Sequence, residues 1–318
     1  MNIEETLSSE NYDEFAWLED TARELGIPFR RPQVRRRWFD VGQGRALSAL
    51  QWGEADPELV FLHGGSQNAH IWDAVLLLLD APAIVIDLPG HGRSFRRADG
   101  NHGGFQNATL LADLLPRAVP TARNVVGMSL GALTAMRLAS ARRDWVERVV
   151  LVDATPPVDA TAVIRAPANH GPLAEQRRRE SYASFQEIMD IAIALNPRRG
   201  LEGLQRETRF NAERRETGEW AWRYDVTSRR PDHPISRAEM LGLWADIEKI
   251  RAPCTLAYAE YSRFVSERNL ETLARLAPHA TSRLVRDSGH NIQVDQPRVL
   301  ADIIGDVMAS PGRSQAPS

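Results

Sequence analysis

Gly127 Met128 Ser129 Leu130 Gly131 is the segment that most strongly indicates the fold of this chain. It follows the apolar residues Val125 and Val126 and precedes a helical run of small residues from Ala132 to Ala139. A strand that ends and a helix that begins at the serine make a sharp turn, which small flanking residues allow and which holds the serine Oγ above the sheet. We therefore predict that Ser129 is a catalytic nucleophile, in preference to the N-cap of an ordinary turn.

Short apolar runs with little alternation flank this turn along the chain. They cover residues 59–62, 83–87, 124–128, 149–153, 255–259 and 282–285, and helical patterns lie between or after them at 69–79, 105–118, 129–142 and 297–308. Strands that are buried on both faces by helices have this composition. The sequence therefore predicts an α/β fold with a mostly parallel sheet.

The chain divides into four predicted parts. Residues 1–32 form an N-terminal helical extension, in which the helical pattern covers 11–26. Residues 33–154 and 247–309 form the α/β core, which opens with an antiparallel hairpin, 33–41 and 45–52. Residues 155–246 interrupt the strand pattern with prolines and helical stretches at 175–195 and 201–217, and we call them the lid segment. Residues 310–318 are a small, polar tail that we expect to be disordered.

A histidine and an oxyanion hole are expected at the same edge of the sheet as Ser129. His290 follows the last predicted strand, so it can reach the serine and act as general base and acid. Leu62 His63 Gly64 Gly65 Ser66 ends the first parallel strand, and the amides of Gly65 and Leu130 are the predicted oxyanion donors. We interpret one more segment as a structural turn nearby, namely Asp87 Leu88 Pro89 Gly90 His91 Gly92 Arg93 Ser94.

These segments together resemble the α/β-hydrolase family, over about residues 35–308. The resemblance implies a mostly parallel eight-stranded sheet with one antiparallel early strand, flanking helices and an inserted helical lid. It also implies the chain order nucleophile, acid, histidine. Neither a metal nor an organic cofactor is implied.

The acid of the predicted triad departs from the usual pattern of that family. In Ala259 Glu260 Tyr261 Ser262 Arg263 Phe264, a serine occupies the position where the family places an aspartate. A hydroxyl cannot supply the negative charge that orients a histidine. Asp153 is the preferred replacement, because it ends the strand next to the nucleophile's strand. Glu260 is the alternative acid, and Asp246 is a distant third.

The lid segment contains an aromatic and polar group that consists of Asn211, Trp220, Trp222 and Tyr224. These residues either line an apolar substrate pocket with a few orienting polar groups, or they form a small core within the lid segment. The sequence leaves both interpretations open.

Composition limits the partners of the protein. The formal net charge is only −3, which argues against a nucleic-acid partner, and short arginine runs at 35–37, 177–179 and 229–230 are expected on solvated faces. No apolar run is long enough to span a membrane, and the acidic start lacks signal-peptide features, so a cytoplasmic location is expected. Cys254 is the only cysteine and is expected to be a core residue.

The sequence thus predicts a serine hydrolase that cleaves an ester or lactone of a small, largely apolar molecule through an acyl-enzyme. The same triad could instead cleave a carbon–carbon bond or act as a cofactor-free perhydrolase. A homologue that only binds a ligand is the alternative from another class, and the missing acid at Ser262 motivates it. The oligomeric state is left open.

Overall fold

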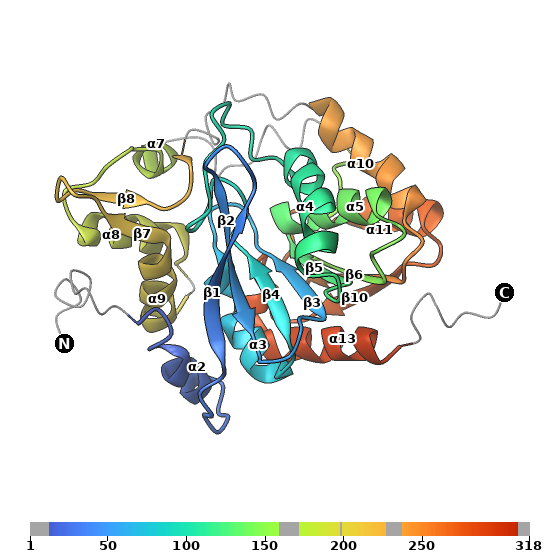
Figure 1. Ribbon diagram of the computed structural model, residues 1–318, viewed down its shortest axis with the longest axis horizontal. Helices are drawn as coiled ribbons and strands as arrows, with labels where there is room; N and C mark the ends of the chain where they lie inside the picture. Colours follow the sequence, from blue (N-terminus) through green and yellow to red (C-terminus); the bar gives the residue numbers. More distant parts are fainter. Residues whose placement is uncertain (1–12, 159–171, 198, 227–236, 311–318) are drawn as a thin grey trace.

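The computed structural model describes residues 13–158, 172–197, 199–226 and 237–310. Its centre is an eight-stranded sheet in the order β1-β2-β4-β3-β5-β6-β9-β10 (Figure 1). The strands are Val34–Asp40 (β1), Ala46–Trp52 (β2), Leu59–Leu62 (β3), Ala83–Ile86 (β4), Asn124–Met128 (β5), Arg148–Val152 (β6), Cys254–Ala259 (β9) and Thr281–Val285 (β10). Strand β2 runs antiparallel to both of its neighbours, and the other pairs are parallel. The predicted mostly parallel sheet is confirmed.

Helices cover both faces of the sheet (Figure 1). Helices α4 (Gly104–Ala118), α5 (Leu130–Ala141) and α10 (Arg237–Lys249) lie on one face, with α11 (Glu267–Leu276) beside α10. Helices α3 (Asp73–Leu79) and α13 (Pro297–Ala309) pack on the other face. A 3₁₀ helix η1 (Ala69–Trp72) leads into α3, and the short helix α12 (Ile292–Asp295) precedes α13.

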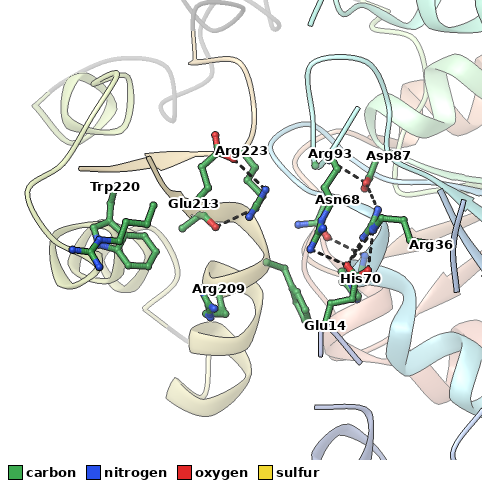
Figure 2. Close-up of a pocket in the computed structure, with 14 residues that line it drawn as sticks. Glu14, Arg36, Asn68, His70, Asp87, Arg93, Arg209, Glu213, Trp220 and Arg223 are labelled. Carbon is green, nitrogen blue, oxygen red and sulfur yellow. Dashed lines mark hydrogen bonds and ion pairs between the residues drawn. The ribbon is translucent and has the colours of Figure 1, made fainter. Parts of the chain in front are cut away.

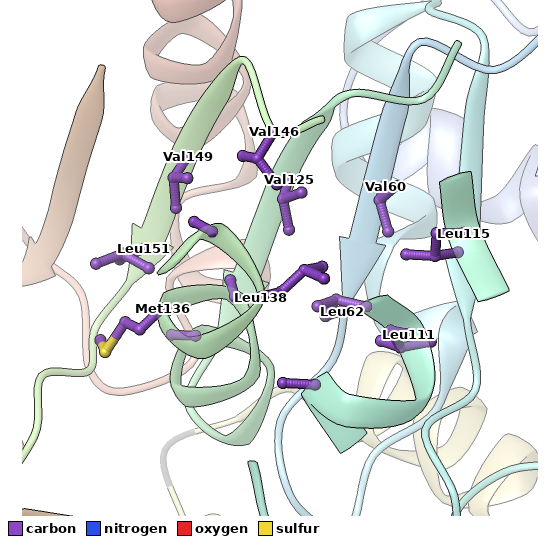
Figure 3. Close-up of a cluster of buried hydrophobic side chains, with 14 of the residues drawn as sticks. Val60, Leu62, Leu111, Leu115, Val125, Met136, Leu138, Val146, Val149 and Leu151 are labelled. Atoms are coloured by element: carbon purple, nitrogen blue, oxygen red, sulfur yellow. The ribbon is translucent and has the colours of Figure 1, made fainter. Parts of the chain in front are cut away.

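Each inner strand contributes side chains to two separate cores. Val60 and Leu62 of β3 join α4 and α5 in one cluster, which Figure 3 shows. Leu59 and Phe61 of the same strand belong to the cluster beneath α3 and α13. Since both faces of the strand are buried, alternation between apolar and polar residues is lost, which is why the strands read as continuous apolar runs. Cys254 is buried in the first of these cores, as expected.

The lid segment is less helical than its sequence pattern indicates. It contains α7 (Pro172–Arg177), α8 (Phe185–Leu195), α9 (Leu201–Asn211) and a hairpin of β7 (Ala212–Arg214) and β8 (Trp220–Trp222). The predicted helical stretches at 175–195 and 201–217 are therefore confirmed only in part. Tyr182 exchanges two backbone hydrogen bonds of 2.8 Å with Trp220, so its stretch of chain is extended and adds to the hairpin.

The predicted boundary of the lid segment at residue 246 falls inside α10. This helix packs against α5, and the buried Asp246 accepts hydrogen bonds from Arg137 (2.7 Å) and Ser140 (3.0 Å) of α5. Helix α10 is therefore part of the core, because Oδ1 of its buried carboxylate binds two side chains of α5. Apart from Ser310, the predicted disordered tail lies outside the described residues.

The N-terminal extension contributes helix α2 (Leu18–Glu24), which is shorter than the predicted helix over 11–26. Just before it, Glu14 receives hydrogen bonds from Arg36 of β1. The expectation that the 35–37 arginines lie on a solvated face is wrong for Arg36, whose side chain is only 10% exposed. Arg36 also contacts the buried carboxylate of Asp87 at 2.8 Å, so two acids compensate its burial. The arginines at 229–230, which are also expected on a solvated face, lie outside the described residues.

Candidate active site

The turn at Ser129 joins β5 to α5 with a strained backbone. Ser129 has φ 51° and ψ −112°, a region that residues with side chains rarely adopt. A Cβ on Gly131 would lie 2.1 Å from the carbonyl oxygen of Leu62, and one on Gly127 would lie 2.3 Å from that of Gly131. Only glycine fits both positions, so the GxSxG pattern is a packing requirement of the turn. Ser129 itself is partly exposed.

His290 and Asp153 meet at the carboxyl end of the sheet. His290 Nδ1 lies 2.8 Å from Asp153 Oδ2, and the amide of Ala259 donates to Asp153 Oδ1 at 2.9 Å. The carboxylate is fully buried, whereas the imidazole is 27% exposed. When Nδ1 carries the proton that this bond needs, the lone pair of Nε2 remains available to accept another.

Glu260 lies elsewhere. Its Oε2 accepts a hydrogen bond from the amide of Asp287 at 2.8 Å, which ties the loop after β9 to the loop after β10. Ser262 also has a local role, because its Oγ accepts hydrogen bonds from the amides of Phe264 (3.2 Å) and Val265 (3.0 Å). The structure therefore brings Asp153, and not Glu260, to the histidine. Asp246 pairs with α5 as described above and is likewise not a partner of His290.

The loop after β3 lies against the Ser129 turn. A Cβ on Gly64 would be 3.3 Å from Ser129 Cβ, so the two backbones approach closely. The amide of Gly64 donates to Gln67 Oε1 at 2.9 Å, which leaves Gly65, the next residue, as the oxyanion candidate on this loop. Leu130, the other candidate, is the first residue of α5.

His63 holds this loop in place through both of its ring nitrogens. Its Nε2 accepts a hydrogen bond of 2.9 Å from the amide of Leu88, and its Nδ1 lies 2.7 Å from the carbonyl of Gly64. Complete burial lowers the pKa of His63, despite the nearby charge of Asp87. A neutral ring with a proton on Nδ1 satisfies both contacts, so His63 fixes the course of the loop.

Sequence reasoning missed two groups around His290. The Phe264 ring is 4.0 Å from the imidazole, centroid to centroid, and is 49% exposed. Gln67 Nε2 donates to Asn291 Oδ1 at 2.9 Å and so links the glycine loop to the histidine loop. In the sequence, Asn291 is adjacent to His290 and Gln67 is near the glycines, but this proximity is only a weak indication that they belong to the site. Nothing in the sequence distinguishes Phe264.

The aromatic residues of the lid segment pack mainly against one another. Trp220, Trp222 and Tyr224 are buried in a cluster with residues of α8, and Trp222 Nε1 donates to Tyr182 Oη at 2.9 Å. Of the two interpretations, the structure thus has Trp222 and Tyr224 in a small core of the lid segment. Asn211 accepts a hydrogen bond of 2.7 Å from Asn68 and joins the lid segment to the core.

A polar cavity of about 130 Å³ lies between the lid segment and the α/β core (Figure 2). Trp220 lines it, together with Asn68 and many charged side chains. Ser129, His290 and Asp153 are not among the lining residues, so this cavity is distinct from the candidate triad. Over the described ranges, no three His, Cys, Asp or Glu side chains are grouped as metal ligands would be. None of the described helices is both long and apolar enough to span a membrane.

A family model for the alpha/beta hydrolase family matches residues 59–303. The chain belongs to the α/β-hydrolase family. This hydrolase is 40% identical over 297 residues to the esterase Rv0045c of Mycobacterium tuberculosis, covering 93% of this chain and 96% of that protein. The crystal structure of that esterase superposes with a TM-score of 0.78 at 39% identity, covering 95% of this chain and 100% of that chain.

More distant relatives share parts of the hydrolase or its fold. A pimeloyl-[acyl-carrier protein] methyl ester esterase of Klebsiella pneumoniae is 36% identical over 106 residues, which are 33% of this chain and 39% of that protein. The crystal structure of E-2-(acetamidomethylene)succinate hydrolase has a TM-score of 0.72 at 18% identity, covering 87% of this chain and all of that one. The second likeness shows the fold alone.

Proposed function

We propose that this α/β-hydrolase is a serine esterase. Ser129 Oγ attacks the carbonyl carbon of the ester while His290 accepts the serine proton. His290 then returns that proton to the departing alcohol as the carbon–oxygen bond breaks, and an acyl-enzyme remains. Water then attacks the acyl-enzyme, with His290 again acting first as base and then as acid, and the carboxylic acid is released.

The observation that carries this proposal is the 2.8 Å contact between His290 and the buried Asp153, at the sheet edge where Ser129 occupies its strained turn. The carboxylate holds the imidazole and stabilises the imidazolium that forms during proton transfer. The amides of Gly65 and Leu130 are the proposed donors to the oxyanion. The 40% identity to an esterase over nearly the whole chain supports ester chemistry.

An apolar ester, or a lactone of similar character, fits the surroundings of His290. The exposed ring of Phe264 is in contact with the imidazole, and Tyr261 of the same loop is 57% exposed. Apolar surface at this position can bury a hydrophobic part of the substrate, at about 25 cal/mol per Å². We expect short-chain and medium-chain acyl esters to be accepted.

Labelling with a fluorophosphonate and burst kinetics with p-nitrophenyl butyrate test the proposal. We expect one label per chain, on Ser129, and a burst of p-nitrophenol that matches the concentration of enzyme. Ser129→Ala should lose the label and the burst, while Ser181→Ala, a lid-segment serine that bonds Glu219, should keep both. A folded wild-type protein with neither label nor burst would instead favour a homologue that only binds a ligand.

A further inference from the structure

The cavity between the lid segment and the core has two walls that differ in the balance of arginines and carboxylates (Figure 2). On the core wall, Arg36 and Arg93 accompany Glu14 and Asp87. Both acids already take part in several hydrogen bonds or ion pairs. Arg36, Ser48 and the amides of Ala69 and Arg93 all donate to Asp87, and Arg36 and Arg93 both contact Glu14.

His70 also lines the core wall. Its Nδ1 lies 2.9 Å from Asp73 Oδ2 and its Nε2 lies 3.3 Å from Glu14 Oε2. Burial alone would lower its pKa, but the two carboxylates outweigh burial and the pKa of His70 is raised. The Phe210 ring stacks on the imidazole at 3.8 Å and also lines the cavity.

The lid wall has an excess of positive charge. Arg209, Arg214 and Arg223 line it with a single carboxylate, Glu213. Arg223 contacts that carboxylate at 3.1 Å and also donates to the carbonyl of Ala212. Counted over both walls, five arginines line the cavity with three carboxylates, so its lining has a net charge of about +2 with His70 neutral.

We propose that this cavity binds a small oxyanion, such as a phosphate or carboxylate group, between Arg93 of the core and Arg223 of the lid segment. Guanidinium groups match the planar and tetrahedral oxyanions with paired hydrogen bonds, and a partly enclosed site strengthens the attraction. The volume of about 130 Å³ is far above the roughly 10–15 Å³ that one water needs, so a tetrahedral oxyanion has room.

The cavity lies next to the loop that borders Ser129. Asn68 lines the cavity, and its neighbour Gln67 accepts the hydrogen bond from the amide of Gly64. The oxyanion is therefore either the charged end of an ester substrate or a free anion that binds beside the active site. Both sources share one binding chemistry. Only the first depends on the proposed esterase function.

Binding of inorganic phosphate to the Ser129→Ala protein, by calorimetry and by thermal unfolding, tests the site without any need for catalysis. We expect saturable binding within about 20 mM phosphate and a rise in Tm, compared with chloride at equal ionic strength. Arg93→Gln and Arg223→Gln should each weaken phosphate binding at least about tenfold, the loss expected for one charge-assisted contact. Arg117→Gln, on an exposed ion pair of α4, should bind as before.

Two outcomes overturn the site. One is the absence of saturable phosphate binding to the Ser129→Ala protein. The other is that Arg93→Gln and Arg223→Gln lower the Tm equally with and without phosphate, because charges that only fasten the lid segment to the core would act in that way.

Kinetics with wild-type enzyme distinguish the two sources. If the site holds the substrate's charged end, a p-nitrophenyl hemiglutarate should have a higher kcat/KM than the neutral valerate, and phosphate should compete with it. If the site holds a free anion, the two esters should react alike while phosphate still binds. If the wild-type enzyme hydrolyses neither ester but still binds phosphate, the result contradicts the proposed esterase function and leaves the oxyanion site intact.

Discussion

Ser129 and Asp153 both have positive φ angles, of 51° and 45°. A residue with a side chain adopts such angles at a cost of about 1–3 kcal/mol, which the surrounding structure must offset. At Asp153, the amide donates to Ala257 and the carboxylate accepts from Ala259, so β9 holds both the backbone and the side chain of this residue. The strain at both positions turns a side chain towards the same edge of the sheet.

The identity of the triad acid can be tested by two isosteric substitutions. Asp153→Asn should lower kcat by about 10³–10⁴, because the amide no longer stabilises the imidazolium and favours the wrong tautomer of His290. Glu260→Gln is the matched control and should stay within about threefold, since its carboxylate only accepts from the amide of Asp287. Steady-state kinetics with p-nitrophenyl butyrate measure both. Equal losses, or a larger loss for Glu260→Gln, would show that the assignment is wrong.

Ahead of helix α2, Glu14 fastens the N-terminal extension to the sheet. Burial would raise the pKa of Glu14, but hydrogen bonds from His70 and Arg36 outweigh burial and hold it well below 4.5. A carboxylate with a lowered folded-state pKa stabilises the protein above its unfolded pKa, and this contribution is lost as the pH falls through the folded pKa.

Glu14→Gln should therefore lower the free energy of unfolding by about 1–3 kcal/mol near pH 7. The difference from wild type should narrow as the pH falls below about 4.5. Urea unfolding between about pH 3.5 and 7.5 measures it, and Glu19→Gln, an exposed acid of α2, is the control. A difference that stays constant over this range would contradict the role of the charge.

Across the whole molecule, the N-terminal extension, the core and the lid segment meet at Phe210. Its ring stacks on His70 of η1 at 3.8 Å and makes a T-shaped contact with the ring of Trp17 at 5.4 Å. Nearby, Arg206 of α9 forms an ion pair with Glu24 of α2. The N-terminal extension and the core, which are distant from α9 in sequence, thus hold this helix in place, and Figure 1 shows α9 next to α2.

Phe210→Ala should loosen α9 without unfolding the core. We expect amide hydrogen exchange in α9 to rise about tenfold, which corresponds to about 1.4 kcal/mol of local stability, while exchange in β5 and β6 changes little. Leu201→Ala removes an exposed side chain from the same helix and is the control. Exchange that rises equally in α9 and in the sheet would mean that Phe210 supports global and not local stability.

The parallel sheet, the Ser129 turn and the position of the histidine loop can all be predicted from the sequence. These features depend on local causes: a strand buried on both faces must be apolar, and a turn this tight requires glycine on either side. The lid hairpin was missed because β7 pairs with β8 and Tyr182 pairs with Trp220, and this strand pairing overrides the local helical pattern.

The acid that faces His290 and the pairing of the charged residues depend on tertiary packing and could not be read from the sequence. Asp153 lies 137 positions before His290, and the burial of Arg36 depends on acids from two other segments. Charges act through space, so their partners are set by packing and not by neighbours in the chain. For the same reason, the cavity between the lid segment and the core has no signature in the sequence.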